Sequence, residues 1–419
     1  MKNSLSFFYE FIHRKGAYVF GATLIARLLS FLASWISLKL IPEVELGYAI
    51  YAFYIISFIV PLAGFGSSQG LLRYGAKLSG KTEKDQLFVY ILKKGTLYTF
   101  LLILIVLLIS SFLTHKIPDA RCFLILFSFS IYSFFLLDIL KIQFRVNHNN
   151  KTYAAVEIVY NILFVIFIYI FSYFYKATGY SIAFIITPII TFLLFYRQLN
   201  INWRIKIKPK LINASFWKYS FFASLAVVSS QLLFAIDIIL IGMILQNATL
   251  VTTYRYILLV PFSFLILTRV VMTTDFVVLT KNINSKNYII KYIKNYTIYF
   301  LIISLLLIGF SFVFGKYILQ LFKKEYEIYD NIFLLLTIAI SGILLLRGLF
   351  DNLLSALGKA TIIYFISVFG LVTNYLLNIY LIPKYGIEGA AITTLITMWS
   401  SGFLSFFIFL YYYRKQKFQ

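Results

Sequence analysis

The sequence predicts an all-α integral membrane protein with twelve transmembrane helices arranged in two six-helix lobes. Three observations support this fold class: an apolar composition, twelve long apolar segments, and an uneven distribution of basic residues between those segments. The chain of 419 residues is 61% hydrophobic and only 13% charged, whereas soluble domains carry about 25% charged residues. So few charges cannot cover a water-soluble fold of this size, and a membrane protein is therefore favoured.

Twelve segments are long and apolar enough to cross a bilayer, which takes about 20 mainly apolar residues. In the first half they lie near 16–40, 47–72, 95–114, 121–140, 153–175 and 179–196, and in the second half near 217–244, 251–279, 297–315, 331–354, 361–381 and 387–412. The longest polar connection separates these two sets of six. We therefore expect an N-terminal lobe over 1–198, a cytoplasmic linker over 199–216 and a C-terminal lobe over 217–419.

The basic residues indicate how the spans are oriented. Of the 38 Lys and Arg residues, 26 fall in the termini and in the loops on the same side, eight fall on the opposite side, and four fall inside spans. Lys and Arg are enriched in cytoplasmic loops, so both termini are expected in the cytoplasm. This distribution also accounts for the net charge of +23, and nucleic acid is not an expected partner.

Arg27 is the sharpest functional candidate of the first half, because an ionisable group inside a span costs about 3 kcal/mol or more and by default marks a functional site. At 100° per residue, Thr23, Arg27, Ser30, Ser34 and Ser37 form one polar stripe on the first span. Such a stripe is expected to face a wet cavity or other protein. The planar guanidinium of Arg27 is suited to binding two phosphate oxygens; the alternative is a structural ion pair between helices.

The second half contains a further set of intramembrane charges. Asp237 in the seventh span could balance a cavity arginine or carry a coupling proton or cation. Arg255 and Arg269 in the eighth span add positive charge, although Arg255 lies close enough to the outer interface to extend to it instead. Arg347 and Asp351 are spaced i,i+4 and are expected to pair with each other.

Two stretches of the chain carry recognisable patterns. Over 40–77, a Gly-Tyr start to the second span is followed by a Gly-rich end that leads to an Arg-aromatic pair. Over 355–394, five residues form a pattern with characteristic spacing: Asn374, Asn378, Pro383, Gly386 and Gly389. Both stretches resemble the O-antigen and polysaccharide repeat-unit flippases of the multidrug/oligosaccharidyl-lipid/polysaccharide (MOP) superfamily. The same residues also have a purely architectural interpretation, because Pro and Gly make turns and small residues let helices approach closely.

The resemblance implies a MATE-like fold of two helical lobes that alternates between inward-open and outward-open states. It also implies a flippase that moves an undecaprenyl-diphosphate-linked oligosaccharide, an O-antigen or related repeat unit, from the cytoplasmic to the periplasmic leaflet of a bacterial inner membrane. The expected partners are that substrate, membrane lipids and the polysaccharide polymerase machinery. No enzyme activity, cofactor or metal is expected, and we expect a monomer.

Two other functions stay open. A cation-coupled multidrug exporter of the same fold would favour an acidic, aromatic cavity, whereas arginines predominate among the mid-membrane charges here. A membrane glycan polymerase or glycosyltransferase would need a sizeable external loop and acidic or His residues near an active site. The longest external loop, near 316–330, is too short to hold a folded domain, and no catalytic constellation can be assembled.

Overall fold

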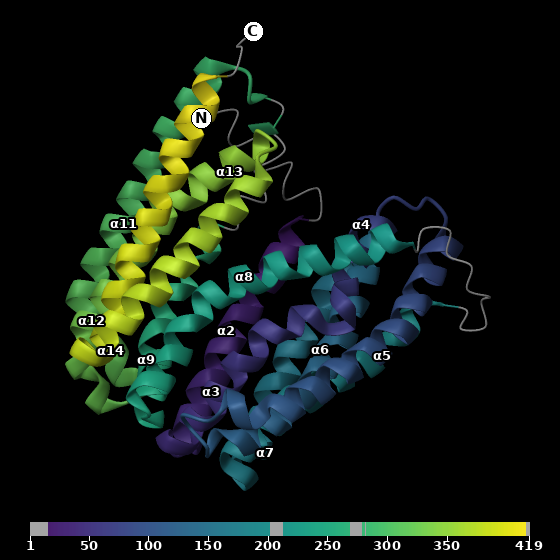
Figure 1. Cartoon of the computed structure of the whole chain (residues 1–419), viewed down its shortest axis with the longest axis horizontal. Coiled ribbons are helices and arrows are strands. Elements are labelled where there is room, and N and C mark those ends of the chain that lie inside the picture. Colours follow the sequence, from purple (N-terminus) through teal and green to yellow (C-terminus); the bar gives the residue numbers. More distant parts are fainter. Residues whose placement is uncertain (1–15, 202–212, 269–278, 281, 416–419) are drawn as a thin grey trace. The chain divides into compact units, whose positions relative to one another are not determined.

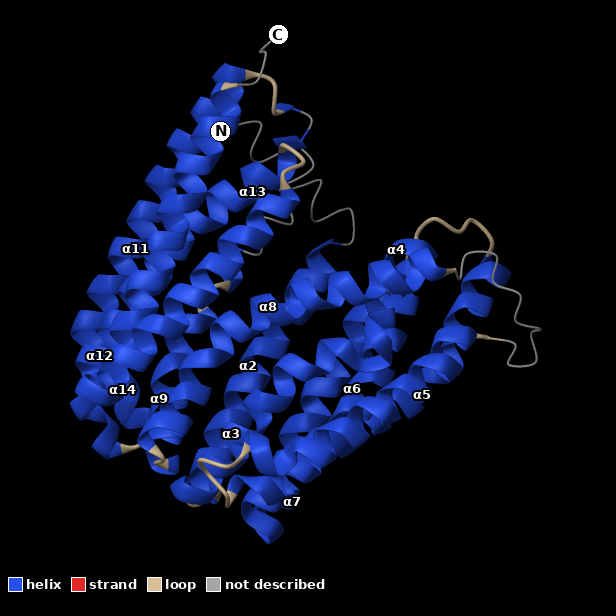
Figure 2. Cartoon of the chain, viewed as in Figure 1, coloured by secondary structure: helices blue, strands red, loops and turns tan. Residues whose placement is uncertain are grey.

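The computed structural model describes residues 16–201, 213–268, 279–280 and 282–415. These residues form helices, turns and short loops and contain no strand (Figure 2). They fall into two compact units, Met1–Gln231 and Leu232–Gln419. The all-α class predicted from the sequence is confirmed.

The first unit is a bundle of long helices (Figure 1). In chain order it contains α2 (Gly16–Leu40), α3 (Glu43–Ile59), the short helix η1 (Val60–Gly66), α4 (Ser67–Gly75), α5 (Lys81–Leu113), α6 (Ala120–Val146), α7 (Asn150–Phe195) and η2 (Tyr196–Leu199). Helix α8 (Ala214–Leu245) begins in this unit and ends in the second. The compact units thus divide inside α8, whereas the predicted lobes divide at the 199–216 connection; the lobe boundaries stay a prediction.

The second unit continues from the end of α8 and is likewise built of helices. It contains α9 (Ala248–Ser263), α11 (Lys286–Phe322), η3 (Lys324–Tyr329), α12 (Asp330–Gly342), the π-helical turn η4 (Ile343–Arg347), α13 (Gly348–Ala356) and α14 (Ala360–Arg414). Buried apolar side chains of α11, α12, α13 and α14 form its core, with Phe350 and Phe409 among the largest.

Nine helices of the described chain are long and apolar enough to cross a membrane, or ten if Ala214–Ser229 and Gln231–Leu245 form one span. Two of the nine, Asn150–Leu199 and Thr361–Arg414, are 50 and 54 residues long. Each has the length for two crossings, since one takes about 20 residues. Each also contains one residue with non-helical dihedral angles, Lys176 or Gly386. Counted on both sides of these breaks, the helices are compatible with the twelve predicted spans.

The chain folds back on itself at both breaks. A Cβ atom on Gly179 would overlap the carbonyl oxygen of Phe171, and one on Gly389 would overlap that of Leu381. In a straight helix, residues eight apart are separated by about 12 Å along the axis. The contacts therefore show two helical hairpins, with the reversal at Lys176 (φ 49°) and at Gly386 (φ 58°).

The helix before each hairpin ends in the same way. His148 (φ 56°) and Gly358 (φ 74°) are left-handed. In each case the next residue donates its backbone N–H to a carbonyl five residues earlier. Asn149 donates to Phe144 at 2.8 Å, and Lys359 donates to Leu354 at 2.9 Å. Each is a left-handed helix cap. The two caps and the two reversals are equally spaced along the chain, so the two halves share an internal repeat, as parallel-repeat transporters do.

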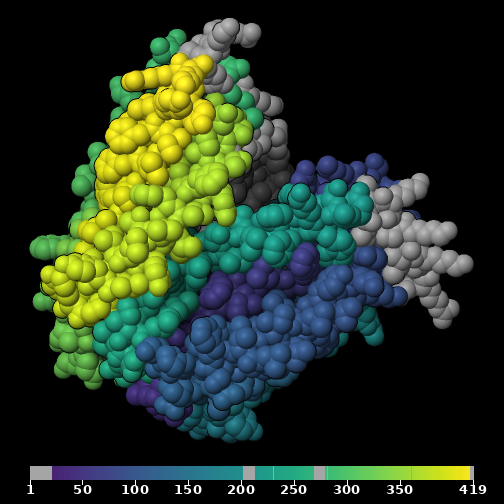
Figure 3. Space-filling view, viewed as in Figure 1, coloured from purple at the N-terminus to yellow at the C-terminus, as the bar shows by residue number. Residues whose placement is uncertain are grey.

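Large apolar side chains cover the outside of both units. Leu108 and Phe112 of α5 are 75% and 82% exposed, and Phe312 of α11 is 76% exposed, while hydroxyl side chains such as Thr187 and Thr191 are buried and bond to their own helix. In the space-filling view, α5 and α14 each lie on the surface of their own unit (Figure 3). Apolar surfaces of this extent are stable against lipid and unstable in water.

Within the first unit, the Gly-rich end of span two packs tightly on the start of α8. Three consecutive residues at the end of η1, Gly64, Phe65 and Gly66, are left-handed, and α4 begins directly after them. A Cβ on Gly66 would lie 2.6 Å from the Cβ of Ser224, and one on Gly70 would lie 2.6 Å from the ring of Phe216. Gly66, which precedes α4, and Gly70 within α4 therefore let α4 and α8 approach closely.

Candidate functional site

Asp237 lies in the interior of the second unit and is the centre of its most extensive side-chain hydrogen-bond cluster among the described residues. It is only 2% exposed and is contributed by the second half of α8. Asn374 Nδ2 donates to its Oδ1 at 2.9 Å, and Asn378 Nδ2 donates to the same oxygen at 2.7 Å. On the other carboxylate oxygen, Oδ2, Thr394 Oγ1 donates a short bond and the Tyr254 hydroxyl donates at 3.4 Å.

The four donors come from both legs of the α14 hairpin and from α9. Asn374 and Asn378 are one helical turn apart on the first leg, so their side chains share a face. Thr394 lies on the second leg, which the reversal at Gly386 and the close approach at Gly389 bring back beside the first. Pro383, at the end of the first leg, lies three residues before the reversal. The motif over 355–394 thus builds one wall of the Asp237 cluster.

Neutral groups surround the carboxylate of Asp237. Within the described part of the chain, the groups that act on it are the two amides and two hydroxyls, and it forms no salt bridge. An ionised carboxylate buried without a positive partner is costly. The carboxylate, amide and hydroxyl oxygens also form a set of hard ligands of the kind that alkali and alkaline-earth cations prefer.

Asn378 has an atom available for such a ligand set. Its Oδ1 is buried and has no hydrogen-bond partner among the described residues, while its Nδ2 bonds to both Asp237 and Asn374. The two ends of an amide side chain are interchangeable when a hydrogen-bond network is assigned. Rotation of this amide would therefore present an oxygen to the carboxylate side of the cluster, where a cation would need it.

The second buried aspartate of this unit has a different environment. Asp351 lies 3.3 Å from Nε of Arg347 and accepts from Ser405 at 2.6 Å, while Arg347 also donates to Ser367 at 2.9 Å. The i,i+4 pair predicted from the sequence is confirmed. Because the two opposite charges compensate each other, this cluster has no need of a bound ion.

The side chains of the polar stripe on α2 have different surroundings. Ser30 donates to Asn161 of α7 at 2.9 Å, and Asn161 in turn donates to the backbone of Glu157. Ser34 bonds to the carbonyl of Ser30 in its own helix. Part of the stripe thus faces α7, whereas Arg27 is exposed on the surface of the unit.

The remaining cationic candidates lie in the second half of the chain. Arg255 of α9 is partly buried, one residue after Tyr254, which reaches Asp237. Arg269 lies outside the described residues.

The amino-acid sequence indicated Asp237, Asn374 and Asn378 as candidate residues but not that their side chains are in contact. It did not indicate Thr394. The signal for Thr394 was its position in the same recognised stretch, one helical turn after Ala390. Its hydroxyl lies 3.1 Å from the Ala390 carbonyl as well as against the carboxylate. The contacts could not be read from the sequence because the residues come from three helices.

The comparisons with known proteins identify the family. The family described as "Polysaccharide biosynthesis protein" matches residues 12–258, which is more than half of the chain. The chain belongs to this family. A comparison with curated proteins finds no match.

Solved structures with a similar fold include MATE transporters and a flippase. An inward-facing multidrug resistance MATE transporter matches with a TM-score of 0.74 at 14% identity, over 93% of this chain and 94% of the other. The lipid II flippase MurJ matches with a TM-score of 0.73 at 18% identity, over 95% of this chain and 87% of the other. A mutant of the Vibrio cholerae MATE transporter VcmN matches with a TM-score of 0.67 at 18% identity, over 100% and 99%. The MATE-like fold expected from the resemblance is confirmed, and the number of helices long and apolar enough to cross a bilayer makes the chain a multi-pass membrane protein.

Proposed function

We propose that this protein is a flippase that moves an undecaprenyl-diphosphate-linked oligosaccharide from the cytoplasmic to the periplasmic leaflet by alternating access. The observation that carries the proposal is the polysaccharide-biosynthesis family match over residues 12–258, on a chain that has the fold of MOP transporters. MurJ, one of the structural relatives, is described as a lipid II flippase. A transporter of this kind moves its substrate without covalent chemistry.

The headgroup of such a substrate is a diphosphate, so its passage requires cationic side chains at membrane depth. Arg27 on α2, Arg255 on α9 and Arg269 are the proposed contacts, with Ser30 and Ser34 as further candidate cavity residues. An arginine fork can bind two phosphate oxygens at once. Arg27 is the strongest of these candidates, since it lies midway along its helix and its side chain is exposed on the first unit.

Asp237 is the proposed coupling residue. Its unpaired charge would be balanced when a proton or a monovalent cation binds, and the cluster would then draw α8, α9 and both legs of α14 together. Binding that favours one arrangement of these helices shifts the population between conformations. Loading and release of the ion would in this way be linked to the transport cycle.

A reconstituted system tests the substrate and the reaction. Purified protein in liposomes should move a lipid-linked oligosaccharide to the opposite leaflet, measured as sugar that a membrane-impermeant glycosidase can or cannot reach. The oligosaccharide should stay the same length. A lengthened product would identify a polymerase instead, and export of cationic dyes without movement of the lipid would identify a multidrug exporter.

Arg27 variants test the site in cells that depend on this protein for surface polysaccharide. Arg27→Ala should abolish the polysaccharide at normal protein level, Arg27→Lys should recover part of it because the ammonium lacks the planar fork, and Arg27→Glu should be no better than alanine. Lys39→Ala, at the end of the same helix beside Trp35, is the matched control and should have no effect. Full export by Arg27→Ala would remove Arg27 from the site.

A further inference from the structure

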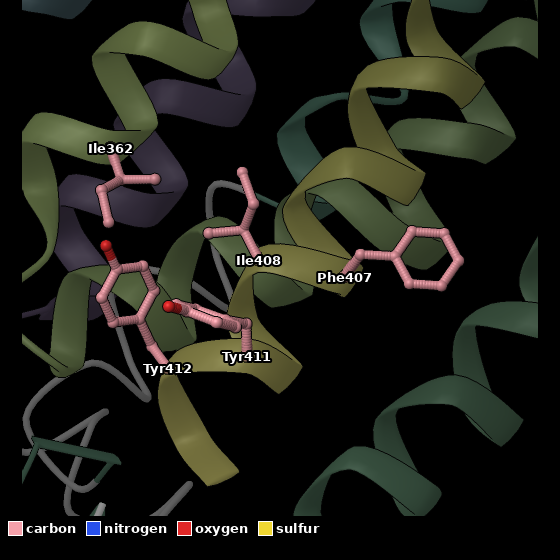
Figure 4. Close-up of a pocket in the computed structure, with 5 residues that line it drawn as sticks. All are labelled: Ile362, Phe407, Ile408, Tyr411 and Tyr412. Atoms are coloured by element: carbon pink, nitrogen blue, oxygen red, sulfur yellow. The ribbon is translucent and has the colours of Figure 1, made fainter. Parts of the chain in front are cut away.

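A cavity of about 390 Å³ lies between the two ends of α14 in the second unit. Ile362 lines it from the start of the helix, and Phe407, Ile408, Tyr411 and Tyr412 line it from the end (Figure 4). The hairpin at Gly386 brings these ends together although they are far apart in the sequence. Apart from the two phenol hydroxyls, every lining side chain is apolar. Tyr411 is 54% exposed and Phe407 is 61% exposed, so the cavity is a slot beside the surface that faces lipid.

Two ammonium groups lie over the rings of tyrosines that line this slot. The Nζ of Lys359, the residue just before α14, is 4.8 Å from the centre of the Tyr412 ring. The Nζ of Lys415, the residue just after it, is 4.2 Å from the centre of the Tyr411 ring. Neither lysine forms a salt bridge with a described residue. The tyrosines that line the slot therefore also hold two positive charges, neither in a salt bridge with a described residue, beside it.

An apolar slot with two cations at its membrane-water boundary matches a ligand with a hydrocarbon chain and an anionic head. We infer that this slot binds one anionic phospholipid, with an acyl chain along Ile362 and Ile408 and its phosphate at Lys359 and Lys415. Basic pockets at the ends of transmembrane helices bind anionic lipid headgroups in this way. A zwitterionic lipid lacks the net charge to match the lysines. An oligosaccharide headgroup would need more polar donors than two phenols and two ammonium groups.

The bound lipid would join the first and last turns of the α14 hairpin. This hairpin also carries Asn374, Asn378 and Thr394, which bind Asp237. The lipid site lies outside that cluster and its residues take no part in the proposed transport reaction. A lipid that holds the two legs together would stabilise the second unit without touching the transported substrate.

Native mass spectrometry of the purified full-length protein tests the inference. Phosphatidylglycerol and phosphatidylcholine with the same acyl chains are the probes, and retained lipid is counted for each variant. The protein should retain phosphatidylglycerol in preference to phosphatidylcholine, and less of it as ionic strength rises. A lysine near an anionic lipid contributes roughly five-fold in affinity, so Lys359→Gln with Lys415→Gln should weaken binding about 25-fold.

Two further variants separate the slot from general surface charge. Ile362→Trp fills the slot and leaves both lysines, and it should lose phosphatidylglycerol as the double variant does. Lys384→Gln is the matched control: Lys384 also stacks on a tyrosine of α14, 3.6 Å from the Tyr380 ring, but it lies beside the Gly386 reversal, at the other end of the hairpin from the slot, and the variant should bind normally.

Three results would overturn the inference. These are equal retention of the two phospholipids, an unchanged affinity in the double lysine variant, or displacement of phosphatidylglycerol by undecaprenyl phosphate at equal concentration. The assay reads lipid binding alone, so its outcome is independent of whether the protein flips an oligosaccharide.

Discussion

Two aspartates are buried among the described residues of the second unit, Asp237 and Asp351, and neutralising each should have a different consequence although the change of side chain is the same. Asp351 is paired with Arg347, whereas Asp237 is surrounded by neutral donors. Asp351→Asn leaves a buried guanidinium without its counter-charge, and breaking a buried pair in this way costs about 3–5 kcal/mol. For a unit of this size, about 1 kcal/mol corresponds to roughly 2–4 °C, so the apparent Tm should fall by about 10 °C.

Asp237→Asn leaves no unpaired charge. The new amide oxygen can still accept from Asn374 and Asn378, and the Thr394 hydroxyl can turn to the Ala390 carbonyl, 3.1 Å away, while it accepts from the new amide. The unfolding free energy should therefore change by only about 1 kcal/mol, the worth of one hydrogen bond. The variant should nevertheless lose transport, because it can no longer hold a cation.

Thermal unfolding in detergent, followed with and without Na⁺ at fixed pH, separates these outcomes. A cation present at 100 times its Kd stabilises the folded state by about 2.7 kcal/mol. The wild-type protein and Asp351→Asn should both gain several degrees on addition of Na⁺, and Asp237→Asn should gain none. An Na⁺ effect of equal size in Asp237→Asn, or none in the wild type, would refute the assignment of a cation to this carboxylate.

Three further predictions follow from the backbone and the charge distribution. Gly70→Leu should destabilise the first unit by about 1–3 kcal/mol because its side chain would enter Phe216 and Ser220, whereas Gly21→Ala, inside α2 and with open space around it, should not lower the Tm in the same thermal unfolding assay. Lys176→Gly should raise stability by about 1 kcal/mol, since the residue is left-handed, and Gly386→Ala should lower it by about 1–2 kcal/mol for the same reason; the two Tm shifts should differ in sign. Reporter fusions near positions 205 and 285 should report cytoplasm and those near 118 and 323 periplasm, and a periplasmic signal at 205 would overturn the topology.

The two helix reversals, at Lys176 and Gly386, differ in how far the local residue types indicate a turn. The turn expected around Pro383 and Gly386 occurs where a glycine can adopt a left-handed conformation. The equivalent turn of the first half occurs at Lys176, which has no turn-forming side chain; apolar length alone indicated a reversal there, between the spans predicted near 153–175 and 179–196. The i,i+4 pair of Arg347 and Asp351 was predictable because both partners lie on one helix and their spacing brings them to one face.

The membrane class, the approximate spans and the expected orientation follow from the amino-acid sequence, because apolar length and the placement of Lys and Arg are local properties that bilayer thickness and surface charge act on directly. The neutral surroundings of Asp237 depend on the folded chain. Its four donors lie on two legs of one hairpin and on a separate helix, and their distances to the carboxylate are set by the way these helices pack. The same reasoning applies to the slot at the ends of α14, whose two lysines are more than fifty residues apart in the sequence and become neighbours of one cavity only when the hairpin has closed.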